Sequence, residues 1–488
     1  MKYQTKIGLE IHLQLATKSK LFCGCSTEFG AVANTQICPV CLGLPGSLPV
    51  FNEKVLDLGI KTGLGLNCQI SNLMQFERKN YFYPDLPKGF QISQFKLPLA
   101  ENGFLEIETE TDVKKTRITR VHLEEDAGKL IHKKEYSCVD YNRCGIPLLE
   151  IVTEPDLTSS IQAYLFLKDL KTLLQYLEVS SCNMEKGELR CDANISLTQT
   201  SSLGAKVEVK NLNSFKAVKD ALSFEEERQK NLLKINKKVI QETRLWDEQK
   251  RETILMRKKE ESPDYRYFPE PDLPPFSIEA KRIERIRRTL VELPHQKKER
   301  FKKEYNLDKK EIELFIRNKN LANFFEKTVS ELKIWMATKS ISKDLLPSSI
   351  KLTSNYLITD LTGLISQKAT GFKDLKIFPE NFAELMTIIQ KKEISSRTAK
   401  DVLKVMFKTG ADPSHIIKEK GLERVSNLDT IEKIAKKIII KNQKAVLDYK
   451  KGKESALEFL LGKIMAETKG RADPIKVREI LRKIISSL

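Results

Sequence analysis

Lys6-Ile7-Gly8-Leu9-Glu10-Ile11-His12-Leu13-Gln14-Leu15 lies near the start of the chain, and several later stretches repeat its alternating pattern. Its apolar residues alternate with glycine and polar residues, which is the period-two pattern of a half-buried β-strand. Because residues two apart share one face of a strand, we expect Glu10 and His12 side by side on the polar face. A carboxylate and an imidazole in that arrangement could both reach one divalent cation. The alternative is a polar face that simply meets water.

Four later stretches, residues 117–124, 147–156, 188–197 and 206–214, repeat the strand pattern. Their polar faces carry His122, Glu124, Glu150, Arg190, Asp192, Glu208 and Lys210. These faces combine oxygen ligands for Mg²⁺ with Arg and Lys side chains suited to phosphate oxygens. We therefore predict one sheet whose concave side is a site for a metal ion and phosphate.

Two acidic features in these stretches favour a bound cation. The cluster Glu124-Glu125-Asp126 ends a predicted strand, and its self-repulsion costs free energy unless a cation offsets it. The alternative is a solvated acidic turn. Glu150 is set in a nearly continuous apolar run, where a carboxylate is rarely buried without a partner. Alternation places Glu124 on the face of His122, but a bulge at the strand end could bring Glu125 there instead.

Four cysteines follow the first strand as two close pairs, Cys23-Gly24-Cys25 and Cys38-Pro39-Val40-Cys41. Two thiolate pairs on tight turns form the tetrahedral four-sulfur shell that zinc prefers. The alternative is four reduced structural cysteines. No histidine or carboxylate is interleaved and no ligand position is open, so the predicted zinc site is structural.

Residues 76–94 have two prolines and a glycine through their centre, which predicts a loop. Basic side chains and aromatic rings share this stretch, and together they could stack bases and bind phosphate. The alternative is a loop that its own aromatic rings hold against the core.

Bulk properties narrow the class of protein. A chain of 488 residues is too long for one core and predicts two to four domains. Its net charge of +18 favours a polyanionic partner, nucleic acid ahead of a membrane. No apolar run is long enough to span a bilayer, and the first strand leaves no room for a signal peptide before it. We therefore expect a cytoplasmic protein.

Beyond the proline-rich residues 271–275 the strand signals give way to helical ones. Ser395 and Ser396 open a predicted helix that stops at Gly410, and Asp473 caps the last helix. Many lysines and arginines surround the final two predicted helices, which suits binding to an anionic partner in a salt-sensitive way. For the charged run at residues 281–305, a solvated helix face is favoured over direct RNA contact.

Seven motifs now identify a family. Residues 7–12, 78–85, 122–129, 189–194, 209–214, 241–244 and 264–272 resemble the B subunit of the tRNA-dependent amidotransferases. Several motifs in one order are far more specific than any one of them, and the resemblance covers the whole chain. All four cysteines are present here, whereas some relatives lack the zinc ligands.

The resemblance implies the fold class and the reaction. The fold is α+β, with an N-terminal sheet-based cradle domain and zinc knuckle (1–292), an all-α helical domain (293–405) and a small basic helical tail for tRNA binding (406–488). Family members convert Glu-tRNA(Gln), and often Asp-tRNA(Asn), to the amidated form. The B subunit uses Mg-ATP to phosphorylate the side-chain carboxylate of the attached amino acid, and ammonia then displaces the phosphate. This is a carbon–nitrogen ligase with glutamine as nitrogen donor.

The resemblance also assigns roles within the predicted site. Catalytic roles fall to Glu10, His12, Glu125 and Glu150. The magnesium ligands are expected among His12, Glu124, Glu125, Glu150 and Asp192. Nucleotide phosphate is expected at Lys79, Arg190 and Lys210, and structural zinc at Cys23, Cys25, Cys38 and Cys41.

The nitrogen source must lie on another chain. No cysteine has the neighbours of a glutaminase nucleophile, and there is no Gly/Ser-rich amidase signature. The resemblance implies a heterotrimer with an amidase (glutaminase) subunit and a small bracing subunit, and the cognate aminoacyl-tRNA synthetase as a further partner.

Two other functions compete with this prediction. One is a zinc-containing tRNA-binding or translation factor without chemistry, which would gain nothing from acids facing an anion. The other is a metal-dependent nuclease, which would use similar carboxylates and would degrade the RNA strand.

Overall fold

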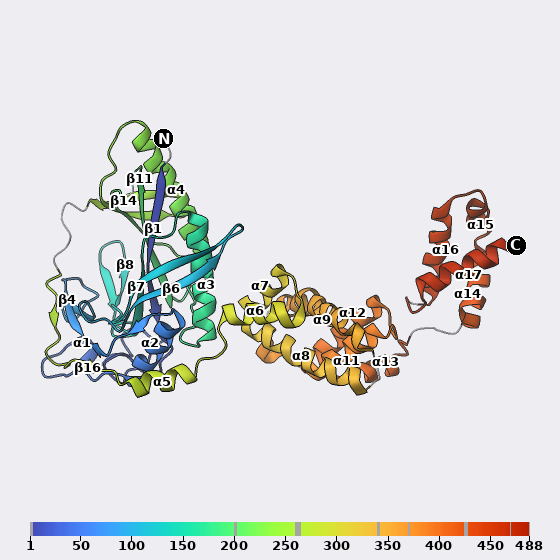
Figure 1. Ribbon diagram of the computed structural model, residues 1–488, viewed down its shortest axis with the longest axis horizontal. Helices are drawn as coiled ribbons and strands as arrows, with labels where there is room; N and C mark the ends of the chain where they lie inside the picture. Colours follow the sequence, from blue (N-terminus) through green and yellow to red (C-terminus); the bar gives the residue numbers. More distant parts are fainter. Residues whose placement is uncertain are drawn as a thin grey trace. The chain divides into compact units, whose positions relative to one another are not determined.

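The computed structural model describes residues 3–199, 203–258, 265–338, 342–368, 371–423, 428–468 and 470–487 (Figure 1). Asp264, the first residue of the 264–272 motif, lies outside them. The chain divides into two compact units, Met1–Pro294 and His295–Leu488. Each unit is described by itself.

The first unit is built on a nine-stranded sheet. In spatial order its strands are β14 (Glu252–Lys258), β13 (Glu242–Asp247), β12 (Val207–Lys210), β11 (Leu189–Thr198), β1 (Gln4–Gln14), β10 (Pro147–Thr153), β7 (Val113–Glu125), β6 (Ala100–Glu108) and β2 (Gln69–Ile70). Neighbours pair antiparallel except β12 and β13, which are parallel because the helix between them carries the chain back. The five strands predicted from the sequence are therefore adjacent, with β1 in the middle.

The register places the polar residues in a row across four strands. His12 pairs with Arg190 of β11 on one side and with Glu150 of β10 on the other. Glu150 pairs in turn with His122 of β7. Because directly opposite residues of antiparallel strands have their side chains on the same face, this row forms one continuous polar strip.

The opposite face of β1 forms the core of the first unit. Ile7, Leu9, Ile11 and Leu13 are at most 1% exposed. Helices α2 (Glu53–Gly65), α3 (Ser160–Tyr176) and α4 (Phe215–Lys234) pack on the sheet, and α3 and α4 also pack on each other (Figure 1). Each fully buried Leu or Ile contributes about 1.5–3 kcal/mol, so slipping β1 by one residue would turn these four side chains out of the core at a large cost in stability.

Short strands and helices complete this unit. They are β15 (Phe268–Pro269), β4 (Glu77–Asn80) and β5 (Phe90–Ser93) in a three-stranded sheet; β16 (Phe276–Ser277) with β3 (Leu73–Met74); β8 (Lys129–His132) with β9 (Ser137–Asp140); and helices α1 (Pro39–Leu42) and α5 (Ala280–Arg288). The prediction of a loop over residues 76–94 is wrong at both ends, because β4 and β5 pair with each other there. The two prolines affect only the connection between these strands, where the loop prediction holds.

Within its described residues, the regular secondary structure of the second unit is entirely helical. Its elements are α6 (Pro294–Tyr305), α7 (Lys309–Arg317), α8 (Lys319–Thr338), η1 (Lys343–Leu345), α9 (Leu346–Asn355), η2 (Tyr356–Leu361), α10 (Thr362–Gln367), η3 (Phe372–Asp374), α11 (Pro379–Gln390), α12 (Ser396–Thr409), α13 (Pro413–Glu419), α14 (Leu428–Lys441), α15 (Gln443–Lys450), α16 (Glu454–Glu467) and α17 (Pro474–Ser486).

The predicted helix ends in this unit are confirmed. Ser395 caps α12 by accepting a hydrogen bond from the backbone N–H of Thr398, and Gly410 ends the helix with a left-handed φ of 75°. Asp473 likewise caps α17. The α+β class is thus confirmed, whereas the boundaries at 292/293 and 405/406 stay a prediction. Among the described residues, no helix is both long and apolar enough to cross a bilayer.

Candidate functional site

Three side chains from three neighbouring strands converge on the polar face of the sheet. They are His12 of β1, Glu124 at the end of β7 and Glu150 of β10, and one ligand atom from each lies within 4.8 Å of the others. His12 Nδ1 donates to Glu124 Oε1 at 3.0 Å. Glu124 and Glu150 are only 2% and 8% exposed. We call this group the acid–histidine trio.

Both carboxylates of the trio are held in their ionised form. Burial raises the pKa of Glu150, but the charge of His122 and its hydrogen bond lower that pKa to about 2. Burial opposes ionisation of Glu124 as well, yet its hydrogen bonds from His12 and His122 keep its pKa well below the usual range. Burial lowers the pKa of His12, whereas Glu124 and the charge of Glu150 raise it to about 9. The trio therefore gathers negative charge that must be balanced by a proton or by a metal ion.

The trio fits a divalent cation such as Mg²⁺. Mg²⁺ is usually held by one or two carboxylates, with waters and substrate phosphates completing an octahedron. His12, Glu124 and Glu150 would supply the protein side of such a shell. A metal ion there would balance two buried carboxylates that otherwise depend on histidine protons.

The structure separates Glu124 from Glu125. Glu125 points away from the trio: Lys88 Nζ donates to its Oε1, and the backbone N–H of Ile92 donates to the same oxygen at 2.9 Å. Lys88 and Glu125 also line a cavity of about 220 Å³ that Cys41 borders. In this arrangement Glu124 rather than Glu125 is the carboxylate in reach of a shared metal ion.

Arg190 and Lys210 lie on the β11–β12 side of the trio. Arg190 Nη2 donates to Asp126 at 2.7 Å, while its buried Nε has no hydrogen-bond partner within the described residues. A buried guanidinium N–H without a partner is costly, so it marks a place for an anionic ligand. Lys210 Nζ lies between Asp192 and Glu208, 3.0 Å from Glu208 Oε1. Asp192 is therefore engaged with Lys210 rather than with the trio.

Glu10 and Lys79, the two remaining predicted residues, lie near the trio on different strands. Glu10 accepts a hydrogen bond from Asn194 at 2.9 Å, and it lies two residues before His12 on β1. Lys79 lies on β4, away from Arg190 and Lys210. Burial lowers the pKa of Lys79, but the charges of Glu124, Tyr267 and Glu150 raise it above its ordinary value. Lys79 is thus a cation beside the acids of the trio.

Two residues that the sequence placed near the site, but to which it assigned no catalytic or ligand role, belong to the site. His122 is 2% exposed and donates through Nε2 to Glu150 Oε2 at 3.0 Å. Asp126 holds Arg190 and also lies 3.2 Å from Arg143 Nε. The sequence feature that could have identified His122 as a site residue is its position on the same strand face as Glu124. Its pairing with Glu150 depends on strand order, which a single strand pattern does not reveal.

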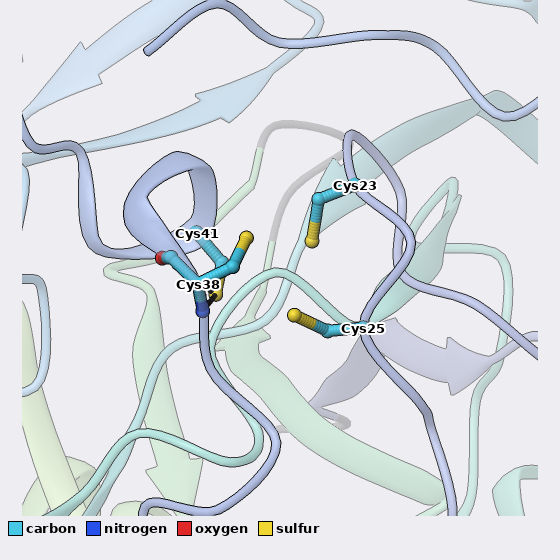
Figure 2. A group of neighbouring side chains, drawn as sticks. All are labelled: Cys23, Cys25, Cys38 and Cys41. Carbon is cyan, nitrogen blue, oxygen red and sulfur yellow. Dashed lines mark hydrogen bonds between the residues drawn. The ribbon is translucent and has the colours of Figure 1, made fainter.

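The four cysteines of the knuckle come together at one point (Figure 2). Cys38 and Cys41 lie at α1, and Cys23 and Cys25 lie on the facing loop (Figure 2). Their sulfur atoms are all within 4.8 Å of one another and none forms a disulfide. Zn–S bonds of about 2.3 Å give a tetrahedron with edges of about 3.8 Å, so the four thiols fit zinc. The wholly buried Lys20 donates to Cys41 Sγ at 3.6 Å and would offset the charge of a four-thiolate site.

Comparison with known proteins places this chain in a class. Residues 5–284 match the family model for the GatB/GatE catalytic domain, and residues 339–485 match the model for the GatB domain. The first match contains the acid–histidine trio and the four cysteines.

Curated relatives narrow the class further. The chain is 47% identical to the B subunit of the aspartyl/glutamyl-tRNA(Asn/Gln) amidotransferase of Carboxydothermus hydrogenoformans, with 100% of each chain covered. It is 45% identical to the B subunit numbered 2 of the same enzyme in Clostridium acetobutylicum, again over 100% of both chains. The chain therefore belongs to the family of aspartyl/glutamyl-tRNA(Asn/Gln) amidotransferase B subunits.

Proposed function

We propose that the chain is the B subunit of a glutamine-dependent tRNA amidotransferase that activates the side-chain carboxylate of Glu-tRNA(Gln), of Asp-tRNA(Asn), or of both. ATP is the phosphoryl donor and a partner glutaminase supplies ammonia. The observation that carries this proposal is the acid–histidine trio, because its buried, ionised carboxylates would be out of place on a surface that only binds RNA. Family membership across the whole chain supports the same conclusion.

The reaction requires a better leaving group than a carboxylate provides. An oxygen of the side-chain carboxylate attacks the γ-phosphorus of ATP, the bond to ADP breaks, and an acyl phosphate forms. Ammonia then attacks the acyl carbon, phosphate leaves and a proton is released, which gives the amide. Mg²⁺, when bound, would neutralise negative charge on the transferred phosphoryl group.

The chain's own residues position the reactants for this transfer. His12, Glu124 and Glu150 would hold the metal ion, and His122 orients Glu150 through the 3.0 Å hydrogen bond. Arg190, with its unpartnered Nε, would bind nucleotide phosphate from the β11–β12 side. Lys79 would approach the same phosphoryl group from β4. Such fixed cations stabilise charge that develops in the transition state.

The remaining parts of the proposal concern partners and the tail. The ammonia would come from an amidase subunit, with a small bracing subunit completing a heterotrimer and the cognate aminoacyl-tRNA synthetase as a further partner. We propose the catalytic cradle at 1–292, the helical domain at 293–405 and the tail at 406–488. The tail would bind tRNA through the basic side chains around α16 and α17.

The test is an amidation assay on the heterotrimer reconstituted with the amidase and the small subunit. Radiolabelled Glu-tRNA(Gln), ammonium chloride and Mg²⁺ are supplied with and without ATP, and Asp-tRNA(Asn) is tested in parallel. We expect amidated aminoacyl-tRNA only when ATP is present, and intact tRNA throughout. Amidation without ATP would refute the phosphorylation step, and RNA cleavage would favour a nuclease.

Arg190→Lys is expected to raise the KM for ATP by roughly tenfold, because lysine keeps the charge but loses the planar set of donors. The variant should leave the KM for Glu-tRNA(Gln) unchanged. Arg117→Lys is the matched control, since Arg117 pairs with Asp156 at 2.7 Å outside the site and is 63% exposed. Steady-state kinetics with ATP as the varied substrate measure both, and equal KM values would argue against nucleotide binding by Arg190.

A further inference from the structure

Four aromatic side chains gather beside the acid–histidine trio. Phe95 stacks on Tyr267 with ring centres 4.5 Å apart and planes within 10°. Tyr265 meets Tyr267 edge-on at 6.2 Å and Tyr81 at 5.9 Å. We call these four residues the aromatic wall. None of them has a part in the phosphoryl transfer proposed above.

The aromatic wall lies close to the acid–histidine trio and interacts electrostatically with its carboxylates. Ser93, two residues before Phe95, donates through its Oγ to Glu124 Oε2 at 3.3 Å. Lys79 Nζ lies 5.0 Å from the centre of the Tyr265 ring and also interacts with the charges of Glu124 and Glu150, so this cation is near both the wall and the acids. Burial raises the pKa of Tyr267; the charge of Lys79 lowers it, and the charges of Glu124 and Glu150 raise it. Rings and carboxylates therefore share one surface.

The wall lies on the opposite side of the trio from Arg190 and Lys210. Phe95 follows β5, which packs on β7, and Tyr267 precedes β15 in the same three-stranded sheet as β5. Arg190 and Lys210 belong to β11 and β12, on the far side of β1 and β10. In phosphoryl transfer the attacking and leaving oxygens are roughly in line, so donor and acceptor enter from opposite sides. With nucleotide phosphate at Arg190, the acceptor side is the wall.

We propose that the aromatic wall binds the 3′-terminal adenosine of the aminoacyl-tRNA, with the adenine base extending the Phe95–Tyr267 stack. This inference rests on the proposed function, in which the acceptor carboxylate belongs to an amino acid esterified to that adenosine. Phe95 is 45% exposed although it is stacked, so a base can cover it. The guanidinium of Arg120, 5.7 Å from the centre of the Phe95 ring, adds a cation at the same place.

Adenosine also occurs in ATP, so the test must separate the two sources. The probes are a stable amide analogue, 3′-deoxy-3′-(L-glutamylamino)adenosine, the same compound without its base, and a non-hydrolysable ATP analogue. Their affinities are measured by calorimetry on the full heterotrimer. Binding requires no turnover, so the result does not depend on the amidation assay.

For the wild type we expect the adenosine compound to bind roughly ten- to a hundredfold more tightly than the baseless one, the range of one base–aromatic stack. Phe95→Leu keeps an apolar side chain but removes the ring, and should abolish that difference. Phe95→Tyr restores a ring and should retain it. The baseless compound and the ATP analogue should bind equally to all three proteins.

Two results would overturn the inference. One is a wild-type protein that binds both glutamyl compounds equally. The other is a Phe95→Leu variant that loses affinity for the ATP analogue and keeps its preference for the adenosine compound, which would assign the wall to the nucleotide. A wild type that shows the preference but forms no amide would instead contradict the proposed function alone.

Discussion

Replacing Glu150 with glutamine is expected to lower ATP-dependent amide formation on Glu-tRNA(Gln) by on the order of a hundred- to a thousandfold, as the loss of a central charge-stabilising group does. The substitution keeps the size of the side chain and removes the charge from a group that is 8% exposed and hydrogen-bonded to His122. Because the proposed grip on the tRNA lies mainly in the basic tail, tRNA affinity should be unchanged. Amidation rates and filter binding of labelled tRNA measure the two effects separately.

The matched control is Glu106→Gln, which removes a glutamate from an exposed position on β6 of the same sheet. It should retain wild-type activity. Wild-type turnover in the Glu150 variant would remove Glu150 from the site. A parallel loss of tRNA affinity would instead contradict tRNA binding that lies mainly in the basic tail.

Replacing Cys41 with serine is expected to release zinc and destabilise the first unit by several kcal/mol. Binding of structural zinc supplies about 10–16 kcal/mol in small zinc domains, and that free energy is folding free energy. Between β1 and α2 the only helix is the four-residue α1, so little regular structure other than the knuckle orders this described part of the chain. Zinc content by atomic absorption and thermal unfolding with and without chelator measure the effect.

Cys138 provides the control for this experiment. It is an exposed cysteine on β9, outside the knuckle, so Cys138→Ser should keep both the zinc and the melting temperature. A Cys41→Ser protein that melts like the wild type and still carries one zinc ion per chain would contradict a structural zinc site.

Local pattern predicted much of this molecule. The alternation around Glu10 and His12 predicts β1 correctly, because burial of one face sets both the strand and which side chains share a face. Alternation placed Glu124 on the face of His122 but left open which of Glu124 and Glu125 ligates a metal ion. In the structure Glu124 contacts His12, whereas Glu125 pairs with Lys88. The spacing of the cysteines predicted their convergence, since each pair lies on a tight turn and only twelve residues separate the pairs.

What sequence pattern missed depends on contacts between distant segments. His122 reaches Glu150 only because β7 and β10 are neighbours. The residue pattern within a single strand does not show which strands are adjacent in the sheet. The pairing of β4 with β5 was hidden by the prolines between them. Lys79 and Arg190 lie on different sides of the trio because they belong to different sheets. The sequence predicted the same phosphate-binding role for both because both are positively charged, and it did not show that they are apart.

The central position of β1 has a consequence for synthesis of the chain. β1 ends at Gln14, but its two partners, β10 and β11, are complete only at Thr153 and Thr198. At roughly 5–20 residues per second, the ribosome needs on the order of ten seconds or more to deliver them. Both edges of this strand with one apolar face lack a partner until β10 is complete, and one edge still lacks a partner until β11 is complete. Unpaired strand edges favour aggregation. Slow codons between residues 14 and 198 should therefore lower the yield of folded protein more than slow codons in the helical second unit.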